Sequence, residues 1–171
     1  LFYQLNSDQI IEPTCARQTE LPYLTCLGLQ SLESNLESIN HQPFYYRAQI
    51  AAGNSAFNLN VHETAIERYS AAISSVPNSW RINNDLAESQ IALGLLGLAL
   101  LELERSLQIT GETDYSFTAL YLRGDLLMKM GRLDEALISL KQALSISGTG
   151  DTAEQVLHMI RDINMRQSGP S

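Results

Sequence analysis

The stretch 117-FTALYLRGDLLMKMGRLDEALISLKQALSISG-148 contains the pattern that decides the fold. Two small residues, Ala136 and Ala143, stand two helical turns apart and therefore lie on one face of one helix. Leu140 stands between them and fills the space that they leave. Gly131 precedes this helix at the point where the chain must turn, and glycine tolerates the positive φ that such a turn requires. The stretch predicts a closely packed helix hairpin.

The same pattern occurs twice upstream, which indicates an internal repeat. The three residues of the second helix recur 34 residues apart and then 37 residues apart, as Ala65, Tyr69 and Ala72, as Ala99, Leu103 and Ser106, and as Ala136, Leu140 and Ala143. The turn position is occupied in order by Asn60, Gly94 and Gly131. Pro77 and Gly111 end the first two units. Several residues recur at the same offsets, which indicates a true internal repeat.

This arrangement resembles the tetratricopeptide repeat, a helix-turn-helix unit with small residues and Tyr or Phe at these spacings. The resemblance implies an all-α fold, a right-handed α-solenoid of helix hairpins with a C-terminal capping helix. It places three repeats at residues 46–79, 80–113 and 117–150. The third is the best match, although Arg123 stands where the family has an aliphatic residue, and Asn83 is unusual in the second. Residues 114–116 are an insertion before the third repeat.

The two flanks complete the predicted organisation. Residues 1–45 are expected to form an irregular and helical N-terminal segment. Gly28 to Asn40 is expected to be a helix, which either forms the second half of a degenerate first repeat or stands outside the repeats. The three repeats fill 46–150, a capping helix is expected over 151–166, and residues 167–171 are expected to fray. The stripe that would cover the last repeat consists of Val156, Leu157, Ile160 and Ile163.

Composition narrows the class of protein further. The chain has 171 residues, of which 44% are hydrophobic and 18% charged, and a formal net charge of −8. A negatively charged protein is repelled by the phosphate backbone of nucleic acids, so no nucleic-acid partner is expected. No apolar run approaches the roughly 20 residues that cross a bilayer, so no direct membrane insertion of this segment is expected. We expect an extracytoplasmic location such as the bacterial periplasm, with an anchor or signal upstream of Leu1; the alternative is a cytoplasmic location.

The two cysteines, Cys15 and Cys26, both lie in the irregular N-terminal segment. On one continuous helix they would be too far apart to bond, but Pro22 makes a folded-back segment the better expectation. Two readings stay open at this point. A disulfide would close a short loop and indicate an oxidising compartment, whereas two free thiols would behave as small buried hydrophobes.

Catalytic parts are scarce in this sequence. The three histidines, His41, His62 and His158, are widely separated, and none has a Cys or His at a metal-binding spacing. Cys15 and His41 could be drawn as a nucleophile and its base, but no local motif supports this pairing. No glycine-rich phosphate loop occurs. We therefore expect no enzyme activity, no catalytic residue, no metal and no cofactor.

The remaining function is binding of another protein. In a solenoid of helix pairs the first helix of each pair lines a concave groove. The resemblance places the groove positions at Arg47, Ile50, Asn54, Phe57 and Asn58, at Arg81, Asn84, Asp85, Glu88, Ile91 and Ala92, and at Thr118, Tyr121, Leu122, Asp125, Met128 and Lys129. Their mixed chemistry suits a peptide or helix of a partner, in a scaffold, adaptor or sensor protein. The alternative is a structural homo-oligomerisation module that pairs through Trp80, Ile91 and Leu95.

One known family function is disfavoured by the same positions. Members that clamp the C-terminal carboxylate of chaperones use cations and two asparagines, and Asn54 matches one of these asparagines. Ile50 replaces a lysine, Asp85 replaces the second asparagine, and Thr118 and Leu122 replace a basic pair. A carboxylate would lose its charge-assisted hydrogen bonds here and would be repelled by Asp85. A chaperone-tail clamp is not expected.

Overall fold

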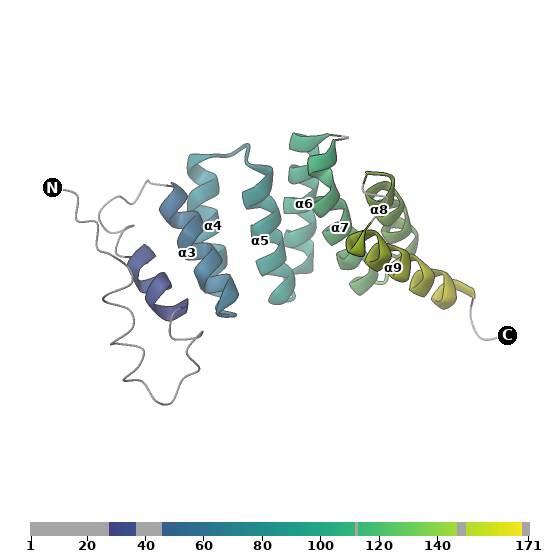
Figure 1. Cartoon of the computed structure of the whole chain (residues 1–171), viewed down its shortest axis with the longest axis horizontal. Helices are drawn as coiled ribbons and strands as arrows, with labels where there is room; N and C mark the ends of the chain where they lie inside the picture. Colours follow the sequence, from purple (N-terminus) through teal and green to yellow (C-terminus); the bar gives the residue numbers. More distant parts are fainter. Residues whose placement is uncertain (1–27, 37–45, 112, 147–149, 169–171) are drawn as a thin grey trace, which may run out of the picture. The chain divides into compact units, whose positions relative to one another are not determined.

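The computed structural model describes residues 28–36, 46–111, 113–146 and 150–168 (Figure 1). The chain divides into two compact units, residues 1–75 and 76–171, which are treated separately below. Helices are the regular elements of the described ranges, and those ranges contain no strand. The all-α fold class is confirmed.

The first unit contains one complete hairpin, formed by α3 (Tyr46–Asn58) and α4 (His62–Ser75). Residues 28–36 are also helical and lie against α3. There, Leu32 and Leu36 pack on Ala48 and Ala52. The helix expected upstream of the first repeat is thus present over 28–36. The question of a disulfide between Cys15 and Cys26 falls on residues outside the described ranges.

The second unit contains two further hairpins and a terminal helix. In chain order its elements are α5 (Trp80–Ala92), α6 (Leu96–Thr110), the 3-10 helix η1 (Asp114–Ser116), α7 (Phe117–Lys129), α8 (Leu133–Ile146) and α9 (Asp151–Ser168). Within each hairpin the helices pack closely, α5 on α6 and α7 on α8. The hairpins are joined by contacts of α6 with α7, and α9 covers α8. Each element therefore contacts its neighbours in the chain, as expected of stacked repeats.

A small residue opposite a large one sets the close approach of the two helices in a hairpin. In the first unit a Cβ on Gly53 would lie 2.6 Å from the Tyr69 ring. In the third repeat a Cβ on Gly124 would lie 2.5 Å from Leu140 Cδ2. Real Cβ atoms do not approach other heavy atoms so closely, so a larger residue would push the helices apart. These pairs confirm the predicted packing role of the small residues.

Two apolar clusters form the core of the second unit. The α5–α6 hairpin and α7 share the first cluster, whose fully buried members are Ala87, Ala99, Leu103, Ala119 and Leu126. The second joins α7, α8 and α9 through Leu127, Ala136, Leu140, Val156 and Ile163. The alanines of the repeat pattern thus point into the interior.

The turns inside the three hairpins share one backbone conformation. Asn60, Gly94 and Gly131 have positive φ values of 59°, 72° and 74°. Asparagine is one of the few residues that adopts this left-handed region without large strain, which explains its equivalence to glycine here. The predicted turn positions are confirmed.

Arg123 is accommodated by a polar contact that replaces the aliphatic packing of the family pattern. Its Nη1 donates a hydrogen bond to Ser139 Oγ across the α7–α8 hairpin, with the two atoms 2.9 Å apart. Ser139 Oγ in turn lies 3.1 Å from the carbonyl oxygen of Glu135, to which it donates. A fully buried serine on α8 therefore receives the long cationic side chain of α7.

The insertion before the third repeat forms the short helix η1. Its Tyr115 ring lies against Trp80 at the start of α5, with the ring centroids 5.5 Å apart. Ser116 is buried, and its Oγ donates to the Thr113 carbonyl at 2.6 Å. Of the three added residues, Ser116 is thus buried, whereas Asp114 and Tyr115 stay exposed.

The capping helix is present but differs from expectation in two details. Val156 and Ile163 are fully buried against the last hairpin, and Ile160 packs beside them. Leu157 is 41% exposed, so its place in the predicted buried stripe is wrong; the helical turn carries it away from α8. The helix also continues to Ser168 instead of ending at 166, and Gln167 Nε2 in its last turn donates to Asp134 Oδ1 at 2.8 Å.

Candidate functional site

On α3, the predicted groove residues share one side of the helix. Arg47 and Asn54 are exposed, whereas Ile50 and Phe57 are half-buried. Asn54 is held in place because Tyr69 Oη donates to its Oδ1 at 2.7 Å. Phe57 packs its ring edge-on against His62, with centroids 5.3 Å apart. This face therefore offers one cation, one oriented amide and two partly covered apolar groups.

On α5, Arg81, Asn84, Asp85 and Glu88 follow the spacing i, i+3, i+4 and i+7 and so form one stripe. Arg81 is exposed, and its guanidinium lies over the Trp80 ring, 5.0 Å from the centroid. Asn84 differs from the expectation of an open groove position, because it is only 4% exposed. Its Oδ1 accepts no hydrogen bond within the described part of the chain.

The two carboxylates of this stripe have perturbed acidity. Burial, with a smaller contribution from the nearby charge of Glu88, raises the pKa of Asp85 from 3.8 to about 6, although Arg81 opposes the change. Burial also raises the pKa of Glu88. Over the described residues neither carboxylate takes part in an ion pair or hydrogen bond. Asp85 is half-buried and therefore poorly hydrated, whereas Glu88 is exposed.

On α7, the predicted positions are already engaged with one another or with the core. Tyr121 stacks on Phe117 with an interplanar angle of 12°. Lys129 Nζ donates to Asp125 Oδ2 at 2.6 Å, so these two charges neutralise each other. Met128 and Tyr121 both pack against the second core cluster. The α7 face is therefore aromatic and nearly neutral.

The faces of α5 and α7 adjoin within the second unit. Ile91 of α5 and Leu122 of α7 pack against the same core cluster, which contains Ala119 and Leu126 of α7. Two of the predicted groove positions, one on α5 and one on α7, thus lie against the same cluster. Ile91, which the oligomer hypothesis also uses, is partly buried. Leu95, in contrast, is 42% exposed.

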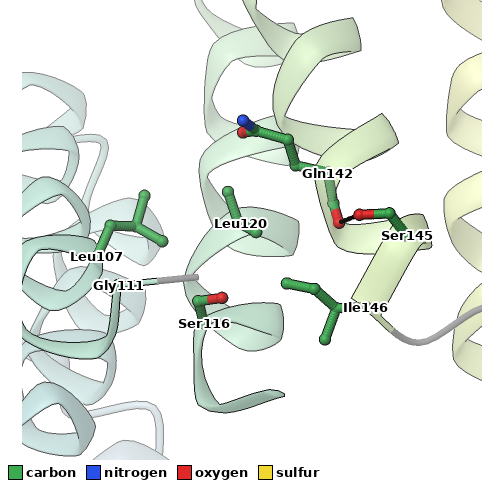
Figure 2. Close-up of a pocket in the computed structure, with 7 residues that line it drawn as sticks. All are labelled: Leu107, Gly111, Ser116, Leu120, Gln142, Ser145 and Ile146. Carbon is green, nitrogen blue, oxygen red and sulfur yellow. Dashed lines mark hydrogen bonds between the residues drawn. The ribbon is translucent and has the colours of Figure 1, made fainter. Parts of the chain in front are cut away.

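A pocket that sequence reasoning missed lies elsewhere in the second unit (Figure 2). It has a volume of about 520 Å³ and lies between the end of α6, the start of α7 and the end of α8. Its lining is Leu107, Gly111, Ser116, Leu120, Gln142, Ser145 and Ile146. Ser116 and Ser145 both donate their hydroxyls to backbone carbonyls. No single motif marks this pocket, because its walls come from three separate segments.

The described residues contain neither a candidate metal centre nor a candidate membrane span. Among them, no group of three or more His, Cys, Asp or Glu side chains is placed to hold a metal ion. No helix among them has the length and apolar character that a bilayer span requires.

Comparison with known proteins identifies the fold. Tetratricopeptide repeat models match residues 50–116 and 117–149, which together make up more than half of the chain. No curated protein matches the sequence significantly.

Solved structures give the same assignment. The first TPR of Spaghetti (RPAP3), bound to the HSP90 peptide SRMEEVD, is 15% identical and has a TM-score of 0.67, over 72% of this chain and 94% of that one. The Sgt2 TPR domain from Aspergillus fumigatus is 19% identical with a TM-score of 0.65, over 74% and 85% of the two chains. The MamA protein is 16% identical with a TM-score of 0.69, over 78% and 71%. Similarity at this level concerns the fold, an all-α solenoid of helix hairpins, and with the family matches it shows that the chain belongs to the tetratricopeptide repeat family.

Proposed function

We propose that this chain is a non-catalytic protein-interaction module that binds a peptide or helix of a partner protein on the first helices of its repeats. The observation that carries the proposal is the α5 stripe. Asp85 and Glu88 are charged groups that the hairpin packing leaves without a hydrogen bond or ion pair in the described residues. Charges of this kind contribute little to folding and gain most from an incoming ligand.

The surroundings of the stripe suit a protein ligand. The Trp80 and Tyr115 rings lie together at the start of α5, and Tyr121 stacks on Phe117 in α7. Aromatic side chains beside charged groups are typical of binding surfaces, because they supply contact area at a small entropy cost. A tetratricopeptide domain with a similar fold, that of Spaghetti, is described as bound to an HSP90 peptide.

The ligand proposed here differs from that acidic chaperone tail. Ile50 and Asp85 stand where the clamp needs a cation and an amide, and Ile50 is half-buried. We therefore place this chain in a scaffold, adaptor or sensor role with its own partner.

Site-specific photo-crosslinking tests the proposal. A photoreactive phenylalanine analogue at Arg81 should capture a partner in the native host, whereas the same analogue at Lys141, an exposed position on α8, should not. The captured partner should then bind more weakly to Arg47→Glu and Arg81→Glu variants whose helicity is unchanged. Equal capture at both positions, or a partner indifferent to both charge reversals, would contradict the assignment of the binding face.

A second candidate, homo-oligomerisation, is favoured by the outer side of α6. Leu95, directly before this helix, and Leu98 and Leu101 on it are 42%, 53% and 43% exposed and recur every third residue. A contiguous exposed apolar row is typical of a protein interface. Light scattering over a range of concentrations tests this candidate. A dimer that Leu98→Glu converts to monomer would support it, and a monomer at all concentrations would refute it.

A further inference from the structure

The pocket at the joint of α6, α7 and α8 has the size of a small-molecule site (Figure 2). Its volume of about 520 Å³ lies within the roughly 300–1,000 Å³ that such sites occupy. Ser116, the last residue of the insertion, is part of its lining, so the pocket lies where the insertion lengthens the joint between two hairpins. None of the described lining residues belongs to the predicted partner-binding groove.

Three helices supply the apolar part of the lining. Leu107 comes from α6, Leu120 from α7 and Ile146 from α8. Leu120 is buried, whereas Leu107 and Ile146 are half-buried and lie on opposite sides of it (Figure 2). An apolar group that enters the pocket would therefore leave water for contact with aliphatic side chains, which favours its binding.

The two serines of the lining act as hydrogen-bond acceptors towards a ligand. Ser116 Oγ donates to the Thr113 carbonyl at 2.6 Å, and Ser145 Oγ donates to the Gln142 carbonyl at 2.7 Å. A hydroxyl has one proton and two lone pairs, so each serine has already used its only donor and can still accept. The lining therefore favours a ligand that carries hydrogen-bond donors.

Two helix C-termini meet at the pocket, because α6 ends beside Gly111 and α8 ends at Ile146. The C-terminus of a helix carries a partial negative charge of about half an elementary charge. The last turns of α7 and α9 contain Lys129 and Arg166, whereas those of α6 and α8 contain no basic residue. None of the described lining residues is charged. The lining thus offers no cation that would compensate these two helix ends.

The start of α7 opposes this negative potential only in part. The N-terminus of a helix carries the positive end of its dipole. Here η1 precedes α7, and the Phe117 N–H donates to the Asp114 carbonyl within this short helix. The carboxylate of Asp114 also stands three residues before α7, where it offsets the positive end. The two C-termini therefore dominate the potential at the pocket.

We propose that this pocket binds a small organic cation, a primary ammonium group carried on an apolar body. The ammonium donates to the serine oxygens at the ends of α6 and α8, and the apolar body packs between Leu107, Leu120 and Ile146. A carboxylate would meet negative helix ends and hydroxyls that have no proton left to donate. This site is independent of the proposed peptide-binding face and adds a second kind of ligand to the chain.

Three probes with one apolar body test the charge preference on the full chain. They are 4-phenylbutylamine, 4-phenylbutanol and 4-phenylbutanoate, titrated while the backbone amide signals are followed by NMR. We expect the amine to bind at least about tenfold more tightly than the alcohol, and the carboxylate to bind most weakly. The largest shifts should occur at Gly111, Ser116 and Ser145. An amine that binds no more tightly than the alcohol, or that shifts another part of the chain, would overturn the proposal.

Filling the pocket should abolish binding. Ser145→Phe places a large ring in the lining from an exposed position and should weaken the amine at least about tenfold. Ser74→Phe is the matched control, because Ser74 is the equivalent residue of the first repeat, is also exposed, and also donates to a backbone carbonyl. The control should change affinity by less than about twofold. Equal loss in both variants would place the binding site elsewhere.

Ser145→Lys and Ser145→Gln separate the effect of the helix ends from that of added bulk. Both side chains are long, but only lysine brings a tethered ammonium to the last turn of α8. The tenfold advantage of the amine over the alcohol should fall below about threefold with lysine and persist with glutamine. The lysine variant should also unfold at a higher temperature than the glutamine variant. The same advantage in both variants would refute the role of the helix ends.

The remaining outcomes concern the source of the ammonium. An alanine-based peptide with one lysine carries the same head group, but a single lysine side chain fills only part of a pocket of about 520 Å³. If that peptide binds at the pocket more tightly than the amine, the site belongs to a protein partner and the small-molecule proposal is wrong. If none of the three probes binds at millimolar concentration, the proposal is refuted. The crosslinking experiment at Arg81 tests the peptide-binding face separately.

Discussion

Replacing Asp85 with asparagine should stabilise the protein at neutral and alkaline pH, with an effect that disappears in acid. Burial raises the pKa of this carboxyl from 3.8 to about 6, so the folded chain prefers the protonated form. The stabilising contribution of that form is complete below the unfolded pKa of 3.8 and is lost as the pH rises through about 6. Asparagine keeps the neutral form at every pH.

The size of the effect follows from the same shift. Each unit of pKa corresponds to about 1.4 kcal/mol, which gives an upper value of about 3 kcal/mol for complete ionisation. Because Asp85 is only half-buried, solvent screens part of this cost. We therefore expect Asp85→Asn to raise the free energy of unfolding by about 1–2 kcal/mol at about pH 8 and by close to zero at about pH 4.

Urea denaturation followed by circular dichroism measures this difference at both pH values. Glu104→Gln, which neutralises an exposed carboxylate on α6, serves as the control and should stay within about 0.5 kcal/mol of the parent. An Asp85→Asn variant that is less stable than the parent at about pH 8, or equally stabilised at about pH 4, would refute the desolvation of this carboxylate. Asp85 would then be as well hydrated as an exposed carboxylate.

The packing of the repeats gives three further predictions. Ala136→Leu should lower the free energy of unfolding by about 1–3 kcal/mol, because its site is fully buried; a melting curve like that of the parent would contradict the assigned register. Gly97→Ala, on open surface inside α6, should raise stability by about 0.5–1 kcal/mol, whereas Gly131→Ala, at a φ of 74°, should lower it; chemical denaturation compares the two. Gly124→Val should destabilise by about 1–3 kcal/mol because its Cβ would collide with Leu140, and a wild-type melting temperature would show that the hairpin can open at no cost.

Much of the fold could be predicted because the residue pattern of the helix hairpin occurs three times in the sequence. The spacing of Ala136, Leu140 and Ala143 determines which face of α8 is buried, and all three are fully buried. The turn positions could also be predicted, because few residue types adopt a positive φ. Asparagine is one of these types, and Asn60 has a positive φ. These features depend on local spacing, which a single sequence contains.

The details of the site depend on residues distant in the sequence and were less predictable. Asn84 was expected on an open groove, but helix packing covers it to 4% exposure. The pairing of Lys129 with Asp125 follows the i, i+4 rule and could have been anticipated, whereas the bond between Arg123 and Ser139 needs the register of α7 on α8. Whether a polar residue is buried depends on that register, and the register cannot be deduced from a pattern of residue types.

The short helix η1 has a consequence for how such a chain can diversify. Three added residues at the joint between α6 and α7 are absorbed by one extra helical turn, and both neighbouring hairpins keep their cores. The same addition delivers the 61% exposed Tyr115 to the ring of Trp80, next to the acidic stripe. Joints of this kind allow selection to lengthen the chain and place a new side chain beside a recognition surface, while the repeats that carry the surface remain intact.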